Sequence, residues 1–222
     1  MSEGLDRVQL IEIYRGLAER YDVYAALLQL IGFRYTAYRK ESIRGLALQP
    51  GDSVVDIGCG TGLNFPYLQQ AVGPTGTIIG VDLTDAMLDK AHQRVLANDW
   101  KNVRLVRSDA ASFSFPSGVD GILSTLALTL VPEYDQVIRN GTRALKQGGR
   151  WAIVDFKMPS NLLAFAAPVL ARLLVQPFGG TIDLASRHPW ESMRMHLRNV
   201  VMTDIFLGMA YIAVGERGPG PN

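Results

Sequence analysis

The chain has 222 residues, of which 48% are hydrophobic and 19% are charged, and its formal net charge is +1. This length suits one domain with a sizeable core, and the near-neutral charge gives no reason to expect a nucleic-acid partner. A single cysteine excludes an internal disulfide framework and is typical of a reducing cytoplasm. We expect no signal peptide, no metal site and no membrane-spanning segment, since no run reaches about 18 apolar residues.

The first 48 residues are expected to be helical. Apolar residues recur at spacings of three and four over residues 5–30, so Tyr14, Tyr21 and Tyr24 share one face of the predicted helix. Such a stripe is typical of core packing, and the alternative is a lid of phenol groups over a pocket. A second helix is predicted over residues 36–48. Its basic cluster belongs either to a solvated face or to a contact with phosphate or an anionic membrane surface: Arg34, Arg39, Lys40 and Arg44.

The segment 54–62 reads VVDIGCGTG, and the rest of the chain is organised around it. Apolar β-formers followed by alternating glycines predict a buried parallel strand and a tight turn into a helix. A helix N-terminus presents free N–H groups, which suit a carboxylate, phosphate or hydroxyl ligand. Asp56 stands two places before the first glycine, and Gly62 falls one place too early for a dinucleotide fingerprint. The pattern therefore argues against a nicotinamide-dependent oxidoreductase.

This segment resembles motif I of the class I S-adenosylmethionine (SAM) methyltransferases. In that family the glycine loop faces the methionyl end of SAM, and the acid before the glycines helps to hold its amino group. The resemblance implies SAM as the cofactor, with contacts from Asp56, Gly58, Cys59, Gly60 and Gly62. Because no histidine or lysine lies near Cys59 in the sequence, we expect this residue to be a small turn residue rather than a nucleophile.

Downstream of the loop, predicted strands alternate with predicted helices. Strands are expected at 77–81, 102–106, 119–124 and 150–156, with two closing strands at 199–205 and 209–214. The alternation predicts an α/β fold: a Rossmann-like doubly wound sheet of about seven strands, mostly parallel with an antiparallel C-terminal strand, plus N-terminal helices. We divide the chain into a helical cap (1–48), a SAM-binding domain (49–214) with a helical insert near 158–198, and a disordered tail (215–222).

Acidic residues follow two further predicted strands. Asp82, followed by Leu83, closes the second strand, where an acid can accept hydrogen bonds from both hydroxyls of a ribose. Asp109, followed by Ala110, closes the third strand, and the resemblance assigns this pair to the adenine ring. Ser124 ends the fourth strand at the family's motif IV position. Because ligands bind such sheets beyond the carboxyl ends of the strands, we expect these residues to share one cofactor site.

Two short segments resemble the UbiE-type (quinone) and PmtA-type (phospholipid) methyltransferases: Glu19-Arg20-Tyr21-Asp22 and Leu130-Val131-Pro132-Glu133. In those enzymes the Tyr-Asp element lies against SAM and the acceptor, which makes Tyr21 a candidate cofactor contact and catalytic residue. The expected acceptor pocket includes Tyr14, Tyr24, Leu126, Arg187, His188 and Trp190, and His188 is the other candidate catalytic residue.

The acceptor is the least determined part of the prediction. The apolar segment 162–178 is either a core helix or a surface that dips into a bilayer. With the basic cluster, it favours a phospholipid head-group amine as the acceptor of a cytoplasmic protein, peripheral on the inner membrane surface. The alternatives are a quinone-precursor C-methyltransferase, a soluble small-molecule N- or O-methyltransferase and, in another class, a non-catalytic membrane-associated binding protein.

Overall fold

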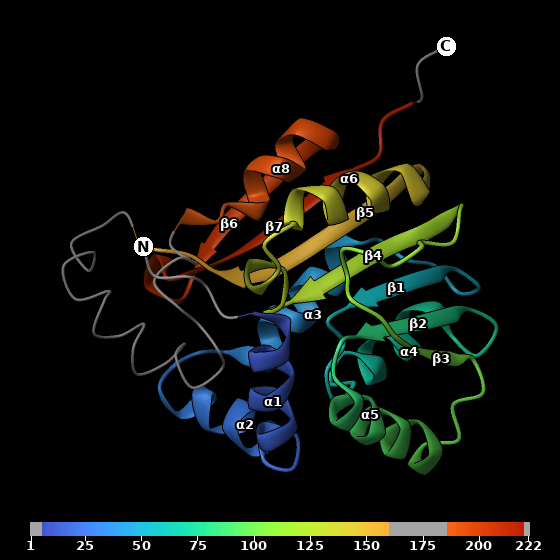
Figure 1. Cartoon of the computed structure of the whole chain (residues 1–222). Helices are drawn as coiled ribbons and strands as arrows, with labels where there is room; N and C mark the ends of the chain where they lie inside the picture. The colour runs from blue at the N-terminus through green and yellow to red at the C-terminus, as the bar shows by residue number, and fades with distance from the viewer. Residues whose placement is uncertain (1–5, 160–185, 220–222) are drawn as a thin grey trace.

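The computed structural model describes residues 6–159 and 186–219. Its centre is a seven-stranded sheet with the strand order β3-β2-β1-β4-β5-β7-β6 (Figure 1). Only β7 runs antiparallel to its neighbours β5 and β6, and the other pairings are parallel. This arrangement confirms the predicted Rossmann-like sheet. The strands are β1 (Ser53–Ile57), β2 (Thr77–Asp82), β3 (Val103–Arg107), β4 (Val119–Thr125), β5 (Leu145–Phe156), β6 (Arg198–Ile205) and β7 (Ala210–Glu216).

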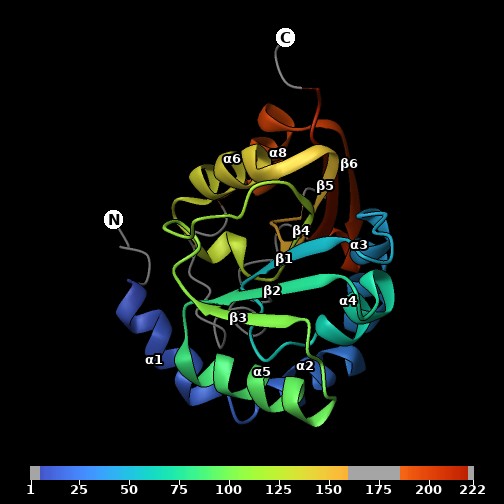
Figure 2. The same cartoon turned by 90° about the vertical axis from the view of Figure 1, so that its right-hand side faces the viewer.

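Helices cover both faces of this sheet. In Figure 2, α6 and α8 lie at the top of the view beside β5 and β6, and α5 lies at the bottom, below β3. Two more helices, α1 and α2, lie beyond the carboxyl ends of the parallel strands, where the arrowheads of β1, β2 and β4 point in Figure 1. The helices are α1 (Arg7–Leu17), α2 (Tyr21–Leu30), α3 (Tyr35–Gly45), α4 (Phe65–Val72), α5 (Asp85–Ala97), α6 (Tyr134–Ala144) and α8 (Pro189–His196), with a short 3₁₀ turn η1 (Leu128–Leu130).

The central strand β1 is buried on both faces, as its apolar run predicts. Val54 packs into the core on the side of α3, α4 and α5, whereas Val55 and Ile57 pack into the core on the side of α6 and α8. Successive side chains of a strand point to opposite faces, so Asp56 points to the same side as Val54. Asp56 is fully buried there, which makes it a charged group that requires partners.

The expected single helix over residues 5–30 is wrong, because the chain forms two helices. α1 ends at Leu17, the N–H of Arg20 donates to the carbonyl of Leu17 at 2.9 Å, and α2 begins at Tyr21. Side-chain periodicity continues through this turn, so the sequence pattern alone did not reveal it. The break brings Tyr14 of α1 and Tyr21 of α2 together, with ring centroids 6.4 Å apart.

Other boundaries differ by a few residues. The second predicted helix ends at Gly45 rather than at residue 48, and Ala47 follows with a φ of 53°. β5 begins at Leu145, earlier than expected, with an irregular register against β4. β7 continues through Glu216, two residues into the expected tail. The apolar segment 162–178 lies outside the described residues, and α8 is the described helix of the expected insert.

Candidate functional site

A cavity lies at the carboxyl ends of β1, β2, β3 and β4, closed on one side by α1. It encloses about 860 Å³, open solvent at its mouth included. The lining residues come from α1, α2 and α5, from the last residues of β1, β2 and β4, and from the segments that follow the four strands. They are Arg7, Leu10, Tyr14, Tyr21, Ile57, Gly58, Gly60, Val81, Asp82, Leu83, Thr84, Met87, Ser108, Asp109, Ala110, Thr125, Leu126, Ala127, Leu130, Val131 and Pro132. We call this space the first cavity.

Asp82 links the end of β2 to the glycine loop. One carboxylate oxygen accepts the N–H of Gly60 at 2.8 Å, and the other accepts the N–H of Thr84 at 2.9 Å. Burial raises the pKa of Asp82, and these backbone donors oppose the rise. Asp82 also lines the first cavity, where a ligand hydroxyl would meet its carboxylate. Asp82 is therefore placed as a hydrogen-bond acceptor in the wall of the first cavity.

The glycine loop leaves room where a side chain would intrude. Gly60 has a φ of +55°, and a Cβ built there would meet nothing within 4 Å. Gly58 has a φ of +66°, and a Cβ there would clash with the side chain of Ala127. Gly58 and Gly60 line the first cavity, whereas Cys59 and Gly62 do not. Burial raises the pKa of the Cys59 thiol, in agreement with a structural role.

Asp56 lies behind the loop rather than in the cavity wall. The side-chain amide of Asn64 donates to both of its carboxylate oxygens, at 2.9 and 3.0 Å, and also contacts Thr125 Oγ1 at 3.0 Å. The buried Arg39 guanidinium hydrogen-bonds Asn64 and Tyr35. Burial raises the pKa of Asp56 to about 7, while Asn64 and Arg39 oppose the rise. This network supports the glycine loop on the side away from the first cavity. Sequence patterns did not identify Asn64 or Arg39 as parts of it.

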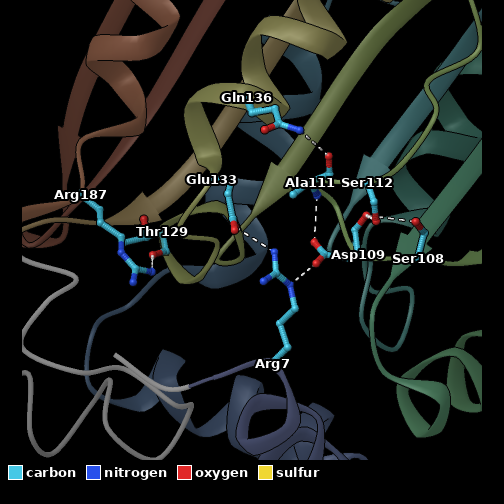
Figure 3. Close-up of polar contacts among 9 residues, drawn as sticks. All are labelled: Arg7, Ser108, Asp109, Ala111, Ser112, Thr129, Glu133, Gln136 and Arg187. Atoms are coloured by element: carbon cyan, nitrogen blue, oxygen red, sulfur yellow. Dashed lines mark hydrogen bonds and ion pairs between the residues drawn. The ribbon is translucent and has the colours of Figure 1, made fainter. Parts of the chain in front are cut away.

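Asp109 and Arg7 face each other across the mouth of the first cavity (Figure 3). The Arg7 guanidinium pairs with the carboxylate of Asp109 and also donates to Glu133 at 2.9 Å. Asp109 further accepts the N–H of Ala111 at 2.9 Å. The guanidinium of Arg7 thus donates to the carboxylate that the resemblance assigns to adenine. Its N–H groups lie where the amino group of adenine would donate. No sequence pattern pointed to Arg7, because 102 positions separate Arg7 from Asp109.

A second cavity adjoins the first and shares Tyr14, Tyr21, Leu126 and Leu130 with it. Its lining is largely apolar and aromatic, with one carboxylate, that of Asp155. The remaining lining residues are Ala25, Leu28, Tyr35, Thr129 and Phe156. Asp155 lies at the carboxyl end of β5, so the same strand-end argument that selected Asp82 and Asp109 would have selected it.

Besides Asp56, Cys59 and Gly62, five more predicted site residues lie outside the lining of both cavities. The side chain of Ser124 is fully buried, and Tyr24 is 37% exposed on α2. Arg187 donates to the carbonyl of Thr129 at 2.9 Å, a contact that Figure 3 shows. The ring centroid of Trp190 lies 4.6 Å from that of His188 and 5.0 Å from that of Tyr211, which it meets edge-on. Trp190 therefore packs onto the core. These five remain untested as ligand contacts.

Solved structures share this architecture. A SAM-dependent methyltransferase from Aquifex aeolicus superposes with a TM-score of 0.61 at 17% identity, over 87% of this chain and 98% of that one. Geranyl diphosphate C-methyltransferase from Streptomyces coelicolor A3(2), solved with S-adenosyl-L-homocysteine, gives a TM-score of 0.61 at 14% identity, over 82% and 79% of the two chains. The fold is that of the SAM-dependent methyltransferases.

Sequence comparison narrows this class to one family. The model of the ubiE/COQ5 methyltransferase family matches residues 3–199. The ubiquinone/menaquinone biosynthesis C-methyltransferase UbiE of Pseudomonas putida (strain GB-1) is 31% identical over 194 residues, which cover 85% of this chain and 75% of the relative. A demethylmenaquinone methyltransferase of Bacillus cereus (strain B4264) is 30% identical over 152 residues, or 68% and 63% of the two chains. This chain belongs to the ubiE/COQ5 methyltransferase family and is a SAM-dependent methyltransferase.

Proposed function

We propose that this chain transfers the methyl group of SAM to a ring carbon of a quinone precursor bound in the second cavity. The observation that carries the proposal is the shared wall: Tyr14, Tyr21, Leu126 and Leu130 line both cavities. A cofactor in the first cavity and an acceptor in the second would then meet across these side chains. The names of the relatives, which refer to quinone pathways, support the acceptor class.

The residues of the first cavity fit SAM by the chemistry of their donors and acceptors. We assign the ribose hydroxyls to Asp82 and the adenine amino group to Asp109, since carboxylates accept such donors. Gly58 and Gly60 would give the methionyl end close access to the backbone, because a side chain at Gly60 would fill open space. SAM supplies an activated methyl group on a positively charged sulfur. Tyr14 and Tyr21 would align the acceptor and exclude water.

A phospholipid head-group amine is the second candidate acceptor. The second cavity offers a carboxylate on Asp155 and the aromatic faces of Tyr14, Tyr21 and Tyr35, which also suit a cation. The relatives named above give it no support, whereas the apolar lining suits a quinone ring. The quinone precursor is therefore the acceptor that we favour.

Transfer from SAM with a tritiated methyl group to three acceptors tests the proposal. The acceptors are 2-prenyl-1,4-naphthohydroquinone, kept reduced, phosphatidylethanolamine in mixed micelles, and the soluble phenol catechol. We expect label in the hydroquinone, and mass spectrometry should place the new methyl group on the ring carbon. Label in phosphatidylethanolamine or catechol alone, or a methyl ether as the product, would contradict the proposed acceptor.

We also propose that α2 docks on a membrane that contains anionic lipid. Its inner side contributes Tyr21, Ala25 and Leu28 to the second cavity. Its outer side exposes four large apolar side chains at helical spacing, 49–81% exposed: Val23, Leu27, Leu30 and, just past its end, Ile31. The exposed Arg20 and Arg34 flank this stripe, and each would gain about 1 kcal/mol from an anionic surface. An apolar stripe between cations suits a lipid surface better than a purely apolar partner.

The predicted basic cluster is corrected at one position, because Arg39 is only 5% exposed and bonds Asn64, Thr125 and Tyr35. Arg34, Lys40 and Arg44 are exposed, as a surface contact requires. Among the described residues, no helix has the length and hydropathy of a membrane span. α2 has 10 residues, too few to cross a bilayer, so contact through α2 would be peripheral.

Vesicle co-sedimentation tests the docking surface. We expect binding to vesicles with 30% phosphatidylglycerol and weaker binding to pure phosphatidylcholine. The double variant Leu27→Glu/Leu30→Glu should release the protein, whereas Leu96→Glu should not, because Leu96 is equally exposed, at 65%, but lies on α5. Unchanged vesicle binding by the double variant would overturn the docking proposal. So would a wild-type protein that binds no vesicles and dissociates from dimer to monomer on the double substitution.

A further inference from the structure

We infer that the carboxylate of Asp155 accepts the hydroxyl proton of the acceptor in the second cavity and so acts as the catalytic base of methyl transfer. The inference rests on the proposed function, because it requires an acceptor with an ionisable ring hydroxyl. A ring carbon is a weak nucleophile until the neighbouring hydroxyl gives up its proton. A base beside the acceptor would therefore contribute directly to the rate.

The position of Asp155 meets the geometric requirement for such a base. It is the only carboxylate among the described residues that line the second cavity, and it lies on a rigid strand rather than on a loop. One oxygen accepts the N–H of Thr129 at 2.9 Å, and the other accepts the N–H of Phe156 at 2.9 Å. These two donors fix the orientation of the carboxyl group. The Thr129 side chain and the Leu128 backbone also favour the ionised carboxyl group. Because Asp155 lines the second cavity, an acceptor bound there would lie against this carboxylate.

The other buried carboxylate on the sheet is differently placed. Both oxygens of Asp56 accept from the same Asn64 amide, and Asp56 lines neither cavity. In contrast, the donors to Asp155 are backbone N–H groups and the Thr129 side chain, all of them uncharged, and Asp155 forms no ion pair in the described part of the chain. A carboxylate that is buried and oriented but not paired with a cation keeps its basicity for a ligand.

The groups that face Asp155 leave it as the base at neutral pH. Burial raises its pKa to about 6, and the N–H groups of Thr129 and Phe156 oppose the rise. The facing titratable groups are phenols from four elements, Tyr14 (α1), Tyr21 (α2), Tyr35 (α3) and Tyr211 (β7). Burial raises the pKa of Tyr14, Tyr21 and Tyr211 above the ordinary value, so these phenols stay protonated.

Two cationic or ionisable side chains lie further out. Arg187 donates to the carbonyl of Thr129, which belongs to the peptide unit after the one whose N–H Asp155 accepts. The predicted candidate base His188 stacks on Trp190 and lies outside the lining of the second cavity. Tyr21, the other predicted catalytic residue, is then left to align the acceptor rather than to take its proton.

The acceptor in the proposed step is a hydroquinone. The Asp155 carboxylate takes the proton of one ring hydroxyl, and the electron pair of that O–H bond moves into the ring. The adjacent ring carbon forms a bond to the methyl carbon while the carbon–sulfur bond breaks, and its electron pair stays on sulfur as a neutral thioether. The methylated carbon then loses its hydrogen as a proton, and the ring oxygen regains one. Asp155 releases its proton to solvent, so one proton leaves per methyl group transferred.

Single-turnover methylation of 2-prenyl-1,4-naphthohydroquinone, measured from pH 5 to pH 9, tests the assignment. For the wild type, we expect a rate that rises through a midpoint near the pKa of about 6 and levels off above it. Asp155→Asn should lower the rate by about 10²–10⁴-fold and abolish this midpoint, while the Kd for SAM stays within about twofold. Asp204→Asn is the matched control, because Asp204 lies on the outer strand β6 and forms an ion pair with Lys157.

The variant Asp155→Glu keeps a carboxylate and covers the case in which Asp155→Asn fails to fold. We expect it to retain the pH midpoint at a reduced rate. The inference is overturned if Asp155→Asn folds and methylates at the wild-type rate, or if the wild-type rate does not change between pH 5 and pH 8. A wild-type protein that binds SAM but transfers no methyl group to the hydroquinone would instead refute the proposed acceptor, which separates the two failures.

Discussion

The carboxylate of Asp82, at the end of β2, accepts a hydrogen bond from the N–H of Gly60, in the loop after β1, at 2.8 Å. This bond joins two neighbouring parallel strands at the edge where the first cavity lies. It couples the acid assigned to the ribose with the loop assigned to the methionyl end of SAM. A change at either residue should therefore affect the same ligand.

Asp82→Ala should weaken SAM binding by about 1.5–3 kcal/mol, because it removes a charged acceptor and frees the Gly60 N–H. Isothermal titration calorimetry measures this as a loss of about 10- to 150-fold in affinity. Asp89→Ala is the control, since Asp89 is exposed on α5 and lines neither cavity. Unchanged SAM affinity in a folded Asp82→Ala protein would refute the ribose assignment.

Gly60→Val should abolish SAM binding at only a small loss of stability. The valine would project into open space in the first cavity, and the positive φ of +55° adds a strain of about 1–2 kcal/mol. Gly118→Val is matched, because Gly118 has a φ of +78° with nothing near its Cβ position but lies outside both cavities. Thermal melts should show similar destabilisation of the two variants. Normal SAM binding by Gly60→Val would show that the loop is only a turn.

Tyr21→Phe should lower turnover by roughly tenfold, about 1.4 kcal/mol, with little change in Tm. The reason is that Tyr21 lines both cavities, at the wall across which cofactor and acceptor would meet. Tyr24→Phe, three residues along α2 and outside the cavities, should leave turnover unchanged. If instead Tyr21→Phe melts several degrees lower and keeps its specific activity, the tyrosine serves core packing alone.

Asn64→Ala should destabilise the fold more at pH 8 than at pH 5. Burial raises the pKa of Asp56 from 3.8 to about 7, so its contribution to stability is full below about pH 4 and is lost as the pH rises through 7. Removing Asn64 takes away the amide that donates to the ionised form of Asp56, so the pKa of Asp56 rises further. The free energy of unfolding then falls more at a pH where Asp56 is ionised. We expect a loss of about 1–3 kcal/mol at pH 8 in urea denaturation.

The control for this variant is Asn98→Ala, which removes an exposed amide that donates to the Arg94 carbonyl at 2.8 Å. Its effect on the free energy of unfolding should be small and should not vary with pH over this range. Equal losses for Asn64→Ala at pH 5 and pH 8 would show that Asp56 is not ionising in the folded protein.

The sequence by itself determined the sheet and one wall of the site. Apolar runs such as Val54 and Val55 indicate buried parallel strands, and glycines mark the turn that follows β1. Since parallel strands end at one edge of a sheet, Asp82 and Asp109 could be placed beside the glycine loop without a structure. These features depend on residues close together in the chain, and that is why a single sequence reveals them.

Only the tertiary structure decided which side chains meet across that edge. Arg7 pairs with Asp109 because α1 lies over the strand ends, and Asp155 shares a cavity with Tyr14, Tyr21 and Tyr35 because the turn before α2 folds three helices around it. Periodicity gives the apolar face of a helix but not the element that this face packs against, so residues far apart in the sequence stay unassigned. For the same reason Asp56 could be recognised as part of the loop motif, whereas its burial against Asn64 could not.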